Sequence, residues 1–116
     1  MELNERVQAI DELLSHVWMV RTFLKHCDEA EEDDELRDVH RELYDYMLAL
    51  GGPLQDEDHE KYLKQAKKKL RKLKSATDLF LEIQPEISSH TNFQMAASSL
   101  KLAVIGVEKL VNEAAG

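Results

Sequence analysis

The residue of this sequence best suited to binding or catalysis is an arginine in the middle of an apolar helical face. In the stretch SHVWMVRTFLKH (15–26), Arg21 shares a helical face with Leu14, Val17 and Leu24. A buried guanidinium must be paired, because an unpaired buried charge is strongly destabilising. Its planar fork of donors suits a carboxylate or a small anion. The sequence therefore predicts either an internal counter-ion for Arg21 or a bound anion.

Other polar residues fall on apolar helical faces that should reach the same end of the molecule. Asp33 is the expected counter-ion of Arg21, and His40 could act as a second donor or as a proton carrier. Two interpretations remain open. In the first interpretation the group is structural: it forms a polar layer that sets helix register, or Arg21 extends past the end of the core. Alternatively, the group forms a pocket for a small anionic ligand. The predicted ligand-binding residues are Arg21, Asp33, His40, Thr77 and Gln84.

Residues for nucleophilic or metal chemistry are not arranged in any familiar pattern. Cys27 is the only cysteine, which excludes an internal disulfide and a multi-cysteine zinc site. The Glu-x-x-His pair of di-metal helical proteins does not occur. The single glycine pair, 51–52, is not a phosphate-binding loop. We therefore predict no catalytic residues, no metal and no cofactor, and we leave enzymatic activity open while favouring its absence.

Amphipathic helices must position these residues. Apolar side chains recur at every third or fourth position through most of the chain, with few breakers between them: 4 glycines and 2 prolines in 116 residues. This spacing predicts four helices, over about 3–27, about 32–50, 56 to about 84, and 91 to about 111.

Residues of the capping and turn types indicate where these helices end. Gly51 can adopt the left-handed conformation and Pro53 cannot continue a helix, so we expect the second helix to stop at GGP (51–53). Asp56 is the expected N-cap of the third helix, which Pro85 should end or kink. Thr91, with Gln94 three residues later, predicts a capping box for the fourth helix (91–94).

The boundary between the first two helices is ambiguous. Between Leu24 and Leu36 the chain has no glycine, proline or large apolar residue. Asp28 could cap a new helix with Glu31 completing a capping box, or the two helices could form one continuous rod. We favour a break, because a continuous rod would expose three turns with nothing to bury.

These elements predict an all-α fold, an antiparallel up-down-up-down four-helix bundle forming one domain over 1–116. The charge pattern supports this topology. Residues 28–45 hold ten acids and two arginines, whereas residues 61–74 hold eight basic residues. A hairpin turned at 51–55 would place these two segments side by side.

Composition also limits the partners. The net charge of −8 disfavours nucleic-acid binding, and the basic run 61–74 lacks the interleaved aromatic residues that stack on bases, so weak nucleic-acid binding is only a third hypothesis. No apolar segment is long enough to span a membrane, and no secretory signal is evident, so we expect no membrane partner and a cytoplasmic location.

A second apolar face on the first and fourth helices predicts self-association. Large apolar residues there point away from the expected core, and so we predict a homodimer. The main functional interpretation is a non-catalytic interaction, scaffold or regulatory protein whose protein partner is unknown. The alternative is a bundle that binds a small anion, with or without catalysis, at Arg21 and His40. The predicted dimer-interface residues are Met19, Phe23, Met95, Leu102 and Ile105.

Overall fold

The computed structural model describes residues 1–113 and contains only helices and the joints between them. Within these residues there is no strand, which confirms the all-α prediction. The predicted domain also includes residues 114–116, which lie outside the described residues. The helices are α1 (Leu3–His26), α2 (Glu29–Glu32), α3 (Asp34–Gln55), α4 (His59–Lys68), α5 (Leu70–Ile87) and α6 (Thr91–Val111).

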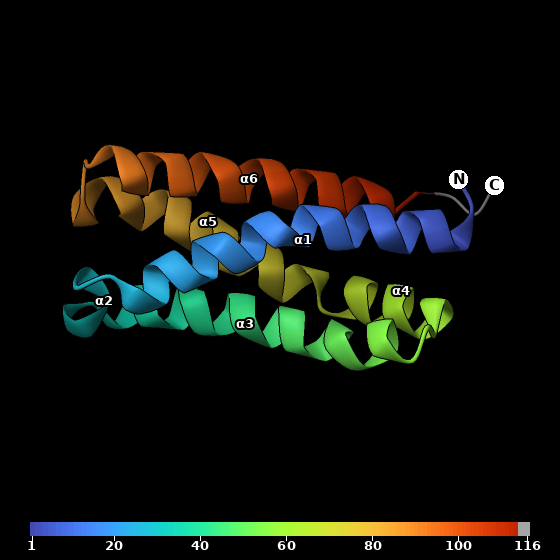
Figure 1. The fold of residues 1–116 in the computed structure, drawn as a ribbon. Helices are drawn as coiled ribbons and strands as arrows, with labels where there is room; N and C mark the ends of the chain where they lie inside the picture. The colour runs from blue at the N-terminus through green and yellow to red at the C-terminus, as the bar shows by residue number, and fades with distance from the viewer. Residues whose placement is uncertain (114–116) are drawn as a thin grey trace.

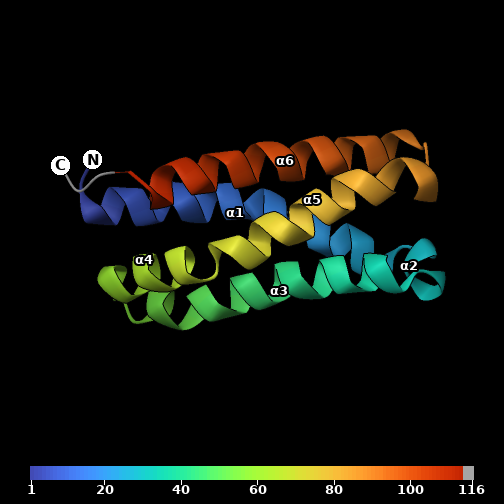
Figure 2. The same cartoon turned by 180° about the vertical axis from the view of Figure 1, so that it is seen from behind.

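Four helical columns lie lengthwise in the molecule, and α4 and α5 together make one of them (Figure 1). α1 packs against α3 and α6, and α5 packs against the same two helices. The start of α1 and the α3–α4 turn lie at one end, whereas α2 and the α5–α6 joint lie at the other (Figure 2). The end of α1, the start of α3 and the end of α5 therefore come together.

The apolar stripes of all four columns meet in one core. The largest side chains there have relative exposures below 2%. Burying a side chain of this size stabilises the fold by roughly 1.5–3 kcal/mol. No column can therefore be removed without exposing the stripes of its neighbours. Among these residues are Ile10 and Leu14 of α1, Leu36 and Leu43 of α3, Tyr62 of α4, Leu73 and Phe80 of α5, and Leu100 of α6.

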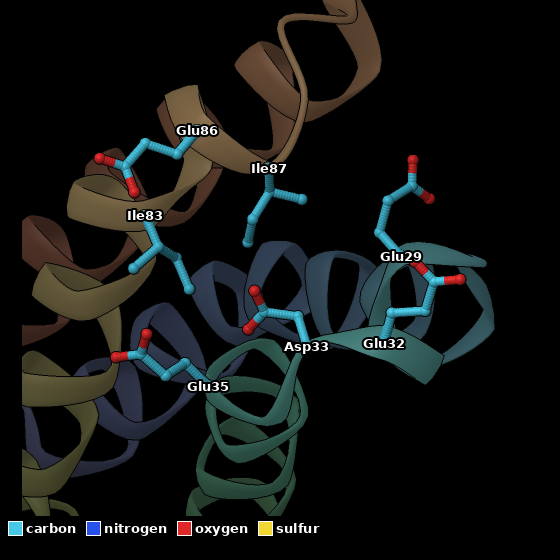
Figure 3. Close-up of a pocket in the computed structure, with 7 residues that line it drawn as sticks. All are labelled: Glu29, Glu32, Asp33, Glu35, Ile83, Glu86 and Ile87. Carbon is cyan, nitrogen blue, oxygen red and sulfur yellow. The ribbon is translucent and has the colours of Figure 1, made fainter.

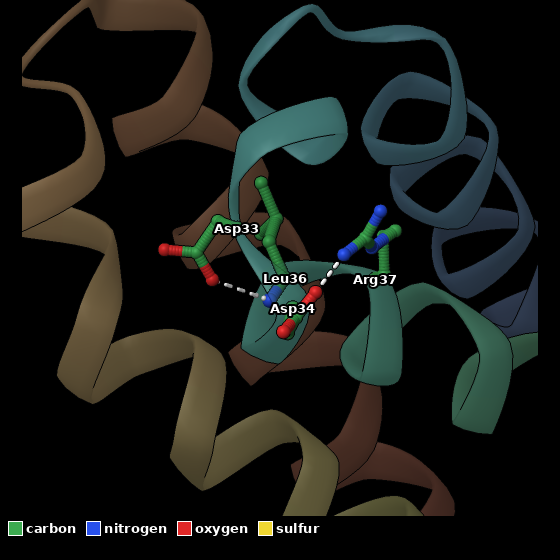
Figure 4. Close-up of polar contacts among 4 residues, drawn as sticks. All are labelled: Asp33, Asp34, Leu36 and Arg37. Carbon is green, nitrogen blue, oxygen red and sulfur yellow. Dashed lines mark hydrogen bonds and ion pairs between the residues drawn. The ribbon is translucent and has the colours of Figure 1, made fainter.

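The chain breaks between α1 and α3, as predicted. Cys27 ends α1 in an extended conformation, and Asp33 is extended before α3. The expected cap at Asp28 does not form, because its side chain makes no capping hydrogen bond. Asp33 is the cap instead, and its Oδ1 accepts a hydrogen bond from the Leu36 N–H at 2.9 Å (Figure 4).

The expected end of the second helix at GGP was wrong. α3 continues through Pro53 to Gln55, and Pro53 is buried in its last turn. A proline here removes its own N–H from the helical ladder and crowds the carbonyl four residues earlier, and both effects are confined to the last turn. The left-handed conformation expected at Gly51 occurs at Glu57, whose φ is 55°.

The turn after α3 is a Schellman motif centred on Glu57. The Asp58 N–H donates to the Pro53 carbonyl at 2.9 Å, and the Glu57 N–H donates to the Leu54 carbonyl at 3.1 Å. The expected N-cap, Asp56, belongs to the end of α3. Asp58 caps α4 instead, since its Oδ1 accepts from the Lys61 N–H at 3.1 Å.

The third column is divided at Lys69, a break that the apolar pattern did not predict. The Tyr46 hydroxyl of α3 donates a buried hydrogen bond of 2.9 Å to the Ala66 carbonyl. In a continuous helix that carbonyl would accept from the Leu70 N–H. We infer that the Tyr46 side chain causes the break, since a side chain entering the helical ladder is a known source of kinks.

The ends of α5 and α6 also differ from the expectations. α5 continues two residues past Pro85 to Ile87, so Pro85 lies inside its last turn. The predicted capping box is absent. The His90 Nδ1 accepts from the Asn92 N–H at 3.0 Å and serves as the N-cap of α6, whereas the Gln94 side chain donates to the Ser89 carbonyl at 2.9 Å.

The Tyr46 hydrogen bond can be tested with a matched pair of variants. Tyr46→Phe should lower the free energy of unfolding by about 1–2 kcal/mol, because a buried hydrogen bond is lost. Tyr62→Phe is the control, since the buried Tyr62 hydroxyl has no hydrogen-bond partner and its loss should cost nothing. Urea unfolding measures both variants. Equal effects would contradict the role assigned to Tyr46.

Candidate functional site

Arg21 packs against two adjacent aromatic rings at the junction of α1 and α3. Its guanidinium carbon is 4.8 Å from the centroid of the Trp18 ring and 4.5 Å from that of the Tyr44 ring. The two rings are 6.3 Å apart and tilted by 40°. A guanidinium within about 6 Å of an aromatic face is stabilised by a cation–π interaction. Together with His40, these three residues form what we call the Arg21 seam.

This position corrects the expected pairing of Arg21 with Asp33. Arg21 is only partly buried. The two ion pairs among residues 1–113 are Arg37 with Asp34 (Figure 4) and Lys74 with Glu108, so Asp33 is not its counter-ion. The aromatic rings provide the compensation that a carboxylate would otherwise supply, because their negative faces attract the cation.

The Arg21 guanidinium retains hydrogen-bonding capacity. Its Nε atom is buried and has no hydrogen-bond partner. The two rings lie on neighbouring sides of the guanidinium, because their centroids are 6.3 Å apart and lie 4.8 Å and 4.5 Å from its carbon.

His40 contributes an uncharged imidazole beside Arg21. Burial lowers the pKa of His40 below its ordinary value of 6.5, and the nearby positive charge of Arg21 lowers it further. Arg41, Lys25 and Arg37 act in the same direction with smaller effects. At neutral pH the imidazole is therefore neutral and can donate one hydrogen bond and accept another.

The other predicted ligand-binding residues have local partners. The Thr77 hydroxyl donates to the Leu73 carbonyl at 2.8 Å, and the Gln84 amide donates to the Ser88 carbonyl at 2.8 Å. Asp33 caps α3. The structure thus brings Arg21 and His40 together and leaves the other three with roles inside the helices. Ligand binding by these five residues remains a prediction.

A hollow of about 380 Å³ lies where α2 and the start of α3 face the end of α5. Five carboxylates surround two isoleucines there, so the hollow would repel an anion. Figure 3 shows the acidic side chains spread around the space rather than converging on one point. Within residues 1–113, no group of three His, Cys, Asp or Glu side chains is placed to hold a metal ion. The lining residues are Glu29, Glu32, Asp33, Glu35, Ile83, Glu86 and Ile87.

Trp18 and Tyr44 are the members of the seam that the sequence analysis missed as functional candidates. Trp18 precedes Arg21 by three residues, and Tyr44 follows His40 by four, so each pair shares a helical face. An aromatic residue one turn from an inward-facing arginine was the available signal. Only the packing of α1 on α3 brings the second ring to Arg21.

The predicted dimer-interface residues divide into two groups. Met19, Met95, Leu102 and Ile105 are exposed. Phe23 is not, because its ring packs edge-on against Phe93 of α6 at a centroid distance of 5.0 Å. The expectation that Phe23 points away from the core was therefore wrong.

The lowered pKa of His40 makes the stability depend on pH. The unfolded chain, in which His40 titrates near its ordinary pKa of about 6.5, binds more protons than the folded chain just below that value. The free energy of unfolding therefore rises with pH through this window and falls as the pH drops through it.

We expect a His40→Gln variant to lose this part of the pH dependence. Urea unfolding of both proteins between about pH 7.5 and about pH 5 measures the difference. The exposed His26 provides the control substitution, His26→Gln, which should behave as the wild type does. Parallel pH profiles for wild type and His40→Gln would contradict the assignment.

The part of the chain that the structure describes contains no helix with the length and apolarity needed to cross a membrane.

Comparison with known proteins gives one match, to a family. No curated protein and no solved structure matches the sequence. A family model described as "Cobalamin adenosyltransferase" matches residues 4–107, which run from the first turn of α1 into α6.

This match corrects the functional prediction. A family of transferases consists of enzymes, so the interpretation as a non-catalytic interaction or scaffold protein was wrong. The alternative, a small-ligand site with enzymatic activity, agrees better with the match. Because the match covers most of its length, the chain belongs to the cobalamin adenosyltransferase family.

Proposed function

We propose that this chain transfers an adenosyl group to cobalamin and that the Arg21 seam binds a phosphate-bearing reactant. The observation that carries the proposal is the family match over residues 4–107. The seam lies entirely within that range. An enzyme of this kind needs a place for an anionic, base-containing molecule, and Arg21 with its two rings has the chemistry for one.

The seam offers complementary groups for both parts of such a reactant. An adenosyl group carries adenine, and cobalamin carries a benzimidazole base and a phosphodiester. Trp18 is 40% exposed and Tyr44 is 37% exposed, so each ring has surface left on which a base can stack. The in-plane N–H groups of Arg21 would pair with phosphate oxygens in a bidentate manner.

His40 would act beside Arg21 as a neutral hydrogen-bonding group. Its lowered pKa keeps the imidazole uncharged near neutral pH, so Arg21 is not opposed by a second cation. An anion bound to Arg21 would offset the positive charge that depresses the pKa of His40. Ligand binding is therefore expected to raise that pKa.

The proposal includes two finer descriptions of the protein. We propose that the four columns form an antiparallel up-down-up-down four-helix bundle, with α4 and α5 together as its third helix. The packing of α1 and α5 on both α3 and α6 supports this topology. We also propose that the protein works in the cytoplasm, for which its single cysteine is the supporting observation.

A spectroscopic assay tests the proposed activity. Reduced cobalamin and ATP, offered as the adenosyl donor, should yield adenosylcobalamin and triphosphate in the presence of the protein. The absorbance change of the corrin follows the reaction. Arg21→Met should weaken binding of the phosphate-bearing reactant by about ten- to a hundredfold, because a charge-assisted hydrogen bond contributes about 1.5–3 kcal/mol.

Arg71→Met is the matched control, since Arg71 is an exposed arginine of α5. It should leave the reaction unchanged. If the wild type forms no adenosylcobalamin, the proposed function is wrong. If Arg21→Met and Arg71→Met behave alike while the wild type is active, the seam is not the binding site.

A further inference from the structure

A groove runs along the edge of the molecule between α3 and α5. Two hollows of about 300 Å³ and about 340 Å³ adjoin each other there, since Glu42 of α3 and Lys72 of α5 line both. The acidic hollow of about 380 Å³ follows one turn further along: Leu79 lines the second hollow, and Ile83, four residues later on α5, lines the acidic one. The three hollows together form what we call the α3–α5 groove.

The α3–α5 groove is widest near α2. Figure 2 shows that α4 lies beside α3, and that α5 moves away from α3 between the α4–α5 break and the α5–α6 joint. At the wide end, α2 and the start of α3 face the last turn of α5 across the acidic hollow (Figure 3). The narrow end lies at the break at Lys69. The side chains of α3 and α5 therefore leave space between the two helices along most of α5.

The floor of the groove is apolar and has the periodicity of a helix. Leu79, Ile83 and Ile87 follow one another at four-residue steps along α5. Leu79 and Ile87 are only partly buried, although both pack against the core. Side chains at four-residue steps form the kind of ridge against which another helix packs. From Lys72 to Ile87 the α5 wall spans about 22 Å at 1.5 Å per residue, the length of a helix of about fifteen residues.

The charges of the groove are ordered along its length. At the wide end every charged lining residue is one of the five carboxylates described above. At the narrow end, Lys69 and Lys72 face Glu42 and Asp45 of α3. The two ion pairs within residues 1–113 involve none of these residues, although the sequence places the basic segment beside the acidic helix. The fold of the described residues therefore leaves the charges of both ends without ionic partners.

This arrangement selects one kind of occupant and one direction. A helix in the groove needs an apolar stripe toward the floor, basic residues at the wide end and toward α3, and acidic residues beside Lys69 and Lys72. The carboxylates stabilise the positive N-terminal end of such a helix, and the lysines stabilise its negative C-terminal end. The helix should therefore run parallel to α3. Nucleic acid and anionic lipid headgroups would be repelled at the wide end.

We propose that the α3–α5 groove binds a basic amphipathic helix of another protein, with the N-terminus of that helix beside α2. An apolar helical face laid into a hydrophobic groove, with charged flanks that set its register, is an established mode of recognition. The groove lies between α3 and α5, whereas the Arg21 seam lies between α1 and α3. The interaction therefore goes beyond the proposed activity and does not depend on it.

Fluorescence anisotropy with a labelled synthetic peptide tests the binding. The probe is a peptide of about fifteen residues with leucines at alternating three- and four-residue steps, lysines mainly in its N-terminal half and glutamates in its C-terminal half. It should bind saturably and gain helical circular dichroism on binding. A peptide of the same composition with the glutamates in the N-terminal half should bind about tenfold more weakly, because its charges oppose those of the groove.

Charge reversal in the protein separates the groove from general attraction to an acidic molecule. Glu32→Lys combined with Glu86→Lys places two cations at the wide end and should weaken binding of the first peptide by about tenfold or more. Glu12→Lys combined with Glu113→Lys is the matched control, since both residues are exposed acids outside the groove. It should leave the affinity nearly unchanged. Circular dichroism checks that both double variants keep their helices.

Energy transfer tests the direction of the bound helix. A donor is attached at Asp28→Cys, beside α2, in a Cys27→Ser background, and an acceptor at either end of the first peptide. Transfer should be stronger to the N-terminal acceptor. The proposal is overturned if the first peptide does not bind saturably, binds without gaining helix, or binds no better than the second. Equal losses in the two double variants, or stronger transfer to the C-terminal acceptor, would overturn it as well.

Discussion

The burial of four apolar stripes in one core is the constraint on which the rest of this structure depends. α1 buries its stripe against α3, α4 and α6, and α5 completes the enclosure between α3 and α6. Because the buried faces set the rotation of each helix, the remaining faces are determined as well. The Arg21 seam and the exposed apolar residues of α6, Met95, Leu102 and Ile105, are residues that the core leaves at its edge or outside it.

Arg21 illustrates how a charge can be accommodated at the edge of such a core. A guanidinium that leaves water must recover the lost solvation, and a buried carboxylate is itself costly to desolvate. Trp18 and Tyr44 stabilise Arg21 without introducing a second charge. Burial lowers the pKa of His40, and the uncompensated positive charge of Arg21 lowers it further.

Helix ends were predicted less well than the helices themselves. GGP (51–53) and Pro85 indicated stops, yet both prolines lie inside last turns, where the missing N–H and the crowded carbonyl affect only the final residues of the helix. The actual turn after α3 uses Glu57 in a conformation more typical of glycine. The division at Lys69 depends on Tyr46, a residue from another helix, so no local pattern could have revealed it.

The sequence by itself determined the all-α class, the four amphipathic columns, the break before α3 and the exposed apolar residues of α6, because periodicity is a local property. It also indicated that Arg21 and His40 would lie near each other. Only the tertiary structure decided that Arg21 meets two aromatic rings rather than Asp33, and that Phe23 faces inward. Those outcomes depend on the rotation and separation of packed helices, which the whole core sets at once.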